Sequence, residues 1–98
     1  MRDKKVLEQV KQTLAHLAQA SPGRAIEVRV PPYAAVQCGD GPTHTRGTPP
    51  NVIEMDATTW LQLASGERTW QDAMEAGLIV ASGVRADLSQ HLPLRMVP

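Results

Sequence analysis

The stretch 57–83, ATTWLQLASGERTWQDAMEAGLIVASG, decides the fold because it predicts two short helices and a strand in immediate succession. Asp56 precedes it, and an aspartate side chain accepts hydrogen bonds from the free amides of a first helical turn, which predicts a helix over 57–64. Thr69 precedes the second helix in the same way, and this helix is expected over 70–76. A glycine follows each helix and ends it.

The third part of the stretch, residues 78–81, is a continuous apolar run bounded by glycines at positions 77 and 83. Such a run is typical of a strand covered on both faces, so we expect it at the centre of a sheet. Upstream, residues 25–30 alternate between apolar and charged side chains, as in a strand with one buried face. Turn-forming prolines and glycines then separate three further predicted strands, at 33–38, 43–46 and 51–55.

The N-terminal region, residues 3–19, is predicted to form an amphipathic helix. Its apolar residues keep to one helical stripe, namely Val6, Leu7, Val10, Leu14 and Leu17. Packing of this stripe on the chain's own sheet is favoured over binding to a membrane or a partner helix. A last helix is expected over 87–92, before Pro93. We therefore predict one α+β domain over residues 1–98, with an N-terminal helix in 1–22 and a sheet of about five strands covered by helices.

Composition argues against several classes of protein. Ten Lys and Arg balance ten Asp and Glu, so the formal net charge is +0 and the basic surplus that binds nucleic acid is missing. No apolar run approaches the roughly 20 residues of a membrane span. The single cysteine, Cys38, favours the cytoplasm. Only Trp60, Trp70 and Tyr33 are aromatic, so an aliphatic core is expected, and the two tryptophans either line a ligand cavity or anchor the short helices on the sheet.

Few residues could carry chemistry. Cys38 and His44 could form a nucleophile and a base, but Cys38 is expected to face inward, where a cysteine is an inert hydrophobe. The three histidines are too scattered for a metal site, and no cofactor is predicted. The loop 44–51 is the densest polar stretch. In it, Arg46 could bind a carboxylate or phosphate, or could pair with a surface acid such as Glu54.

Small residues in 60–83 are spaced in a composite pattern. Glycines stand at positions 66, 77 and 83, and Ala73 lies in the middle of the second predicted helix. This order of helix, glycine, helix, glycine and apolar strand ending in glycine resembles the signature of the sterol carrier protein type 2 family. Two upstream stretches, 30–38 and 44–54, resemble the small bacterial branch of that family. With both halves in register, the resemblance spans residues 24–94.

The resemblance implies an apolar tunnel between the sheet and its helices, and non-enzymatic binding of an apolar ligand such as a fatty acyl chain or a sterol. It also suggests an accessory role beside a separate enzyme, because domains of this branch are found joined to four-helix metal-dependent enzymes. His44 and Arg46 are the candidate contacts for a polar headgroup. The residues expected to line the tunnel are Trp60, Leu63, Met74, Leu78, Val80, Leu88 and Leu92.

Two alternatives remain open at this stage. The chain could be an interaction module with a solid core, which docks through a sheet edge or an exposed helix stripe to form a homodimer or to bind an enzyme. Alternatively, Arg46 and His44 could bind a small anion for an unknown reaction. Uptake of a lipid by a monomer would favour the carrier, whereas a stable dimer without a ligand would favour the module.

Overall fold

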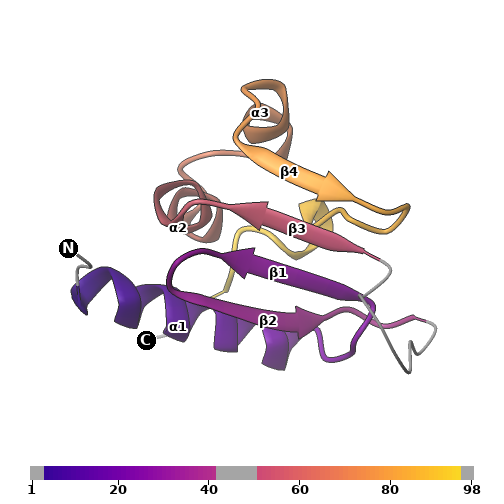
Figure 1. Ribbon diagram of the computed structural model, residues 1–98, viewed down its shortest axis with the longest axis horizontal. Helices are drawn as coiled ribbons and strands as arrows, with labels where there is room; N and C mark the ends of the chain where they lie inside the picture. Colours follow the sequence, from indigo (N-terminus) through magenta and orange to yellow (C-terminus); the bar gives the residue numbers. More distant parts are fainter. Residues whose placement is uncertain (1–3, 42–50, 96–98) are drawn as a thin grey trace.

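The computed structural model describes residues 4–41 and 51–95, and Figure 1 shows one sheet with helices and an irregular C-terminal segment. The predicted α+β class and four of the predicted strands are confirmed. The fifth strand, expected at 43–46, lies outside the described residues. In chain order the elements are α1 (Lys4–Ala20), β1 (Ile26–Val30), β2 (Ala34–Cys38), β3 (Val52–Met55), α2 (Ala57–Ser65), α3 (Trp70–Glu75), β4 (Ile79–Ser82) and the 3₁₀ helix η1 (Ser89–His91).

The sheet is mixed, with the strand order β2-β1-β3-β4. β1 pairs antiparallel with β2 and parallel with β3, and β3 pairs antiparallel with β4. Parallel neighbours cannot be joined by a tight turn, because the chain must return to the end at which the first strand began. The long connection between β1 and β3, of which β2 is a part, meets this requirement.

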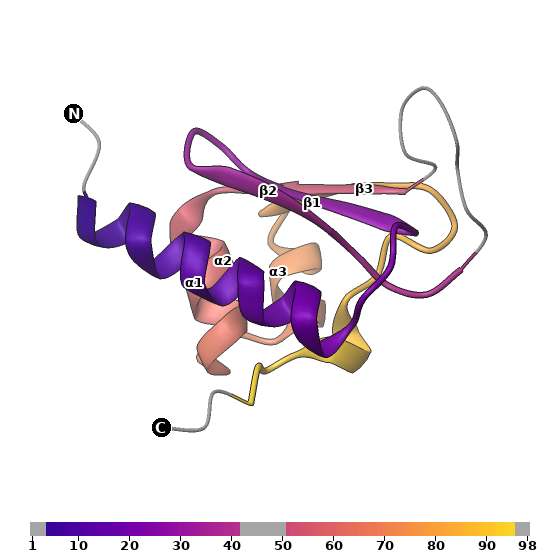
Figure 2. The same ribbon diagram turned by 90° about the horizontal axis from the view of Figure 1, so that it is seen from below.

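The three α-helices all cover the same face of the sheet, as Figure 2 shows. Alternation along β1 explains this layering, because every second side chain of the strand is buried while Glu27 and Arg29 between them are partly exposed and form an ion pair. In the apolar stripe predicted for α1, Val10, Leu14 and Leu17 are buried, whereas Val6 and Leu7 are partly exposed. The core therefore lies between sheet and helices, with Val10, Leu14 and Leu17 from α1 and Ile26, Val28 and Val30 from β1.

Local capping forms the two short helices as the sequence predicts. The Asp56 carboxylate accepts a hydrogen bond from the backbone N–H of Thr59 at 2.8 Å, and the Thr69 hydroxyl accepts one from the N–H of Asp72 at 3.1 Å. Gly66 ends α2 in the left-handed region, at a φ of 89°. Residues that carry a side chain rarely adopt this backbone conformation, so glycine is favoured at this position.

The prediction that residues 78–81 form a central strand is wrong. β4 is the last strand in the sheet of the described residues, and Val80 is 70% exposed. Alternation buries Ile79 toward the helices and turns Val80 to the other face, where it lies opposite Glu54 of β3. An unbroken apolar run does not show how many neighbours a strand has, and here the outward position carries an apolar residue as well.

The prediction of a helix over 87–92 is also wrong, because only the single turn Ser89–His91 is helical, and this turn is a 3₁₀ helix. The Asp87 carboxylate accepts a hydrogen bond from the N–H of Ser89, the first residue of this turn, at 2.7 Å. Pro93 follows too soon for a second turn. A helix this short does not recover the cost of its nucleation, so its side-chain contacts determine its conformation.

The edge position of β4 makes a charge test at Val80 possible. Both Val80→Lys and Val80→Asp are expected to fold, and the lysine variant should be about 0.5–1 kcal/mol more stable, because residue 80 lies directly opposite Glu54. Urea unfolding measures the difference, which should shrink at high salt. Complete unfolding of Val80→Asp would show instead that β4 is covered on both faces.

Candidate functional site

The space between sheet and helices is filled by side chains. Trp60, Leu63 and Leu88, three of the predicted lining residues, are 0%, 1% and 0% exposed. A cavity large enough for water would add accessible area to the side chains around it, so no such space contacts Trp60 or Leu88. The interior at this point is packed like an ordinary protein core.

A fourth predicted lining residue, Leu92, lies half-buried beside this core. Together with Leu63 it lines a depression of about 340 Å³ between the end of α2, the start of α3 and the C-terminal segment, which we define as residues 83–95. Trp70 and Pro93 add apolar surface, whereas Arg68 is one of the polar residues around them. The structure thus brings four of the seven predicted residues to one region.

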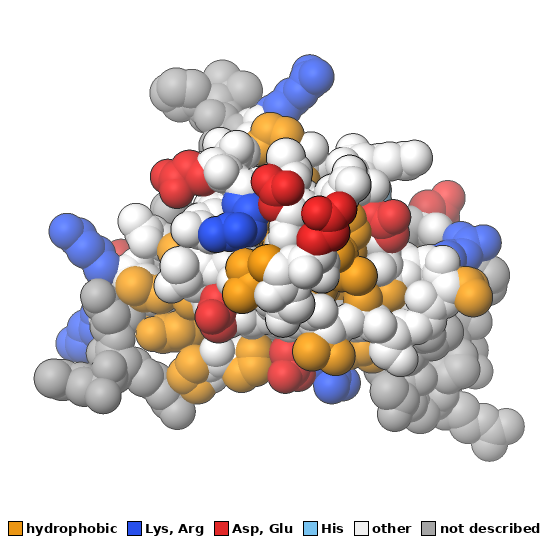
Figure 3. Space-filling model, turned by 90° about the horizontal axis from the view of Figure 1, so that it is seen from above, with side chains coloured by type: hydrophobic (Ala, Val, Ile, Leu, Met, Phe, Trp, Pro, Cys, Tyr) orange, Lys and Arg blue, Asp and Glu red, His pale blue; other side chains and the backbone are white. Residues whose placement is uncertain are grey.

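The other three predicted lining residues lie at the surface. Met74 and Leu78 are 42% and 36% exposed, and Val80 is exposed on the outer face of β4. The inward position predicted for Val80 is therefore wrong, because Ile79 is the residue of β4 that faces the core. Figure 3, seen from the side of α3 and β4, shows hydrophobic side chains gathered between acidic ones.

The C-terminal segment is fastened over the ends of α1 and α2. The Ser21 hydroxyl and His91 Nδ1 are hydrogen-bonded at 2.8 Å, although 70 positions separate them in the sequence. The Leu94 N–H donates to the Ala64 carbonyl at 3.0 Å. The fully buried Leu88 anchors the start of η1 in the core. Arg85 adds two further ties, because its N–H donates to Asn51 Oδ1 at 2.9 Å and its guanidinium donates to the Asp40 carbonyl at 3.3 Å.

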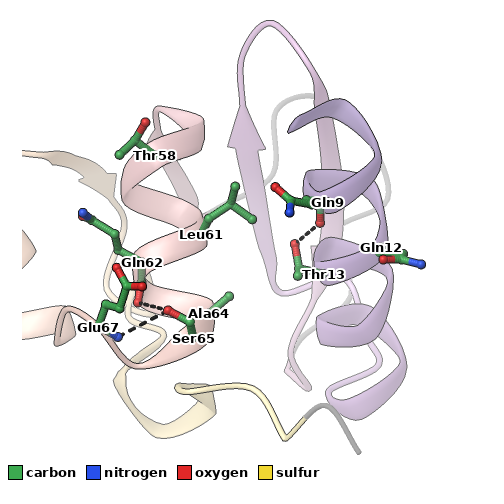
Figure 4. Close-up of a pocket in the computed structure, with 9 residues that line it drawn as sticks. All are labelled: Gln9, Gln12, Thr13, Thr58, Leu61, Gln62, Ala64, Ser65 and Glu67. Atoms are coloured by element: carbon green, nitrogen blue, oxygen red, sulfur yellow. Dashed lines mark hydrogen bonds between the residues drawn. The ribbon is translucent and has the colours of Figure 1, made fainter. Parts of the chain in front are cut away.

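A second depression, of about 500 Å³, lies between α1 and α2 and is called the α1–α2 groove below. In Figure 4, Gln9 and Thr13 project from α1 toward Leu61 of α2, and Ser65 and Glu67 lie at the lower end of α2, with Glu67 on the side away from α1. Its remaining lining residues are Gln12, Thr58, Gln62 and Ala64. Amides and hydroxyls therefore dominate this groove, with an apolar contribution from Leu61 and Ala64.

A side-chain hydrogen bond between Trp60 and Thr13 joins the core to the α1–α2 groove. The indole Nε1–H of Trp60 donates to the hydroxyl of Thr13 at 2.8 Å, and that hydroxyl donates in turn to the Gln9 carbonyl at 2.7 Å. The ring of Trp60 packs in the core while its polar edge contacts a groove residue. Helical periodicity places Thr13 beside the buried stripe, but no local pattern pairs it with Trp60.

The described residues offer little for covalent catalysis. Cys38 is fully buried, and burial raises the pKa of its thiol to about 11, so the thiolate is scarce at neutral pH. Within residues 4–41 and 51–95, no group of three His, Cys, Asp or Glu side chains could hold a metal ion. In the same ranges, no helix is long and apolar enough to cross a membrane.

The loop predicted to bind a headgroup is described only at its last residue. His44 and Arg46 lie outside the described residues, and so does the proposed pairing of Arg46 with Glu54. Asn51 is 3% exposed. Its side-chain amide donates to the Ala25 carbonyl at 2.8 Å and accepts from the N–H of Arg85 at 2.9 Å. The side chain of Asn51 thus serves the fold.

One comparison with known proteins gives a match. A family model described as "Bacterial SCP ortholog" covers residues 2–94, which is nearly the whole chain. Among curated proteins, none matches the chain.

Proposed function

The chain belongs to the family of bacterial sterol-carrier-protein orthologues, and from this premise we propose that it binds an apolar ligand, such as an acyl chain or a sterol, without converting it. The observation that supports this function best is that Trp60 and Leu63 of α2 belong to the same apolar core as Leu88 of the C-terminal segment, with Leu92 packed against it. Leu63 and Leu92 also line the depression of about 340 Å³.

Binding in this region requires the C-terminal segment to move, because the interior holds no water-sized space around Trp60 and Leu88. Displacement of Leu92 would extend the 340 Å³ depression past Leu63 into the core. An entering chain then replaces the apolar contacts that the segment gives up, and burial contributes about 25 cal/mol per Å². Around Leu92 the segment is tied by the Ser21–His91 and Leu94–Ala64 hydrogen bonds, and these are the polar contacts that its displacement would break.

The remaining parts of the proposal rest on the sequence. His44 and Arg46 stay the predicted contacts for a polar headgroup. Met74 and Leu78 stay predicted contacts that require the ligand to extend to the β4 edge. A cytoplasmic location is supported by Cys38, which is a free thiol. Work beside a separate enzyme is also part of this proposal.

A carboxylate introduced at position 92, in the wall of the depression, tests whether Leu92 lines the lipid site. Leu92→Glu is expected to fold and to weaken lipid binding at least about tenfold, because the entering chain would meet a charge that must be desolvated. Native mass spectrometry with laurate, 1-monolauroylglycerol and cholesterol provides the readout. Val80→Glu is the matched control, since it places the same charge on the exposed edge strand and should leave binding unchanged. If Leu92→Glu binds as the unaltered protein does, this lining is wrong.

The β4 edge favours a second candidate function, dimerisation. Residues Ile79–Ser82 contain no charge or proline, which are the usual features that keep edge strands apart. Two β4 strands paired antiparallel about Val80 would place each Val80 against its copy. Light scattering separates the two functions: a monomer that takes up lipid supports the carrier, and a concentration-resistant dimer that refuses all three lipids supports the module.

A further inference from the structure

The α1–α2 groove holds hydrogen-bonding groups that the fold does not use. The side-chain amide of Gln9 points into the gap in Figure 4 and, within the described part of the chain, has no hydrogen-bond partner, whereas the Gln12 amide points away from α2. An amide both donates and accepts, so Gln9 matches a ligand hydroxyl that does the same. The volume of about 500 Å³ suits a small headgroup together with the start of a chain.

The charge of the groove is as informative as its hydrogen-bonding groups. Among the described residues that line it, Glu67 is the one charged side chain. The nearby Arg68 lines the other depression, and its Nε–H donates to Gln62 Oε1 at 2.9 Å. A carboxylate in the groove would therefore lie near another carboxylate without a cation among the lining residues. Like charges in such a site cost affinity, whereas a neutral hydroxyl avoids that cost.

The groove also leads to the proposed lipid site. Thr13 forms part of its wall, and the hydroxyl of Thr13 accepts the hydrogen bond of Trp60 Nε1–H at 2.8 Å. A ligand hydroxyl that reaches this point can accept the same hydrogen bond when α1 and α2 separate. The chain attached to that hydroxyl would then run along the apolar ring of Trp60 into the core.

We propose that the α1–α2 groove binds the neutral, hydroxylated headgroup of the apolar ligand, so that the protein selects lipid alcohols and glycerides over free fatty acids. This inference rests on the proposed lipid-binding function and adds the headgroup class to it. It differs from the sequence prediction, which places the polar headgroup at His44 and Arg46.

Two lipids that share a twelve-carbon acyl chain test the proposal in titrations of tryptophan fluorescence at slightly alkaline pH. We expect 1-monolauroylglycerol to bind at least about tenfold more tightly than laurate. Glu67→Gln should bring the two affinities closer by strengthening laurate binding. Gln9→Leu should weaken binding of the glyceride. Gln37→Leu, on the exposed surface of β2, is the matched control and should change neither affinity.

The outcomes distinguish failure of the headgroup assignment from failure of the proposed lipid-binding function. Equal binding of both lipids, or a preference that persists unchanged in Glu67→Gln and Gln9→Leu, overturns the headgroup assignment and leaves the lipid site standing. Tighter binding of laurate that is lost in Arg46→Ala also overturns it and moves the headgroup to the 44–51 loop. If the protein binds neither lipid, the proposed function itself fails and the headgroup assignment with it.

Discussion

Trp60→Ala is expected to lower the free energy of unfolding by about 3–5 kcal/mol, the range for removal of a large aromatic side chain from a packed core. Trp60 is the largest fully buried side chain of the described residues, and it joins α2 to α1 through its bond to Thr13. Small domains have only about 5–15 kcal/mol of stability, so the variant should unfold at a much lower urea concentration. Urea unfolding followed by circular dichroism measures this loss.

Trp60→Phe separates packing from the hydrogen bond. It keeps most of the apolar volume and removes the indole N–H, so a loss of roughly 1–2 kcal/mol is expected. The result for Trp60→Ala also bears on the function. A loss below about 1 kcal/mol would indicate that Trp60 already borders an open space, because a cavity adds little cost where one exists. The filled interior described above would then be incorrect, and the C-terminal segment would have no need to move.

Local chemistry explains which parts of the fold could be predicted. The caps at Asp56 and Thr69 depend on contacts three residues away, and the stripe of α1 depends on a repeat of three and four. Both are visible in the sequence. The position of β4 is not, because a run of four apolar residues has the same composition at an edge as at the centre of a sheet. The number of neighbouring strands is set by the whole chain.

The candidate site shows the same division. Trp60 and Leu63 could be placed in the core because apolar spacing marks the inward face of α2. Leu88 and Leu92 were selected from the spacing of a helix that does not form, although Leu88 is buried. The bonds from Trp60 to Thr13 and from Ser21 to His91 could not, because they join residues 47 and 70 positions apart. The α1–α2 groove was missed for this reason: its walls come from two helices whose relative placement no local pattern contains.

Asn51 is the clearest case of a residue whose predicted and observed roles differ. In the sequence it ends a polar loop with the composition of a ligand site. In the structure its side chain joins the chain before β1 to the segment after β4, through Ala25 and Arg85. Its own carbonyl accepts from the N–H of Glu27 at 2.9 Å. Three parts of the chain therefore meet at one buried side chain.

Asn51→Ala should lower the free energy of unfolding by about 2–4 kcal/mol, because it leaves the Ala25 carbonyl and the Arg85 N–H without their partner. Asn51→Asp keeps the acceptor for Arg85 but sets a buried carboxylate against the Ala25 carbonyl, so at neutral pH it should be no more stable than the alanine variant. Gln37→Ala removes an exposed amide and should stay within about 0.5 kcal/mol of the unaltered protein. Urea midpoints compare the three. If Asn51→Ala matches Gln37→Ala in stability but loses lipid binding, Asn51 is a ligand contact after all, and the bridge between the strands is dispensable.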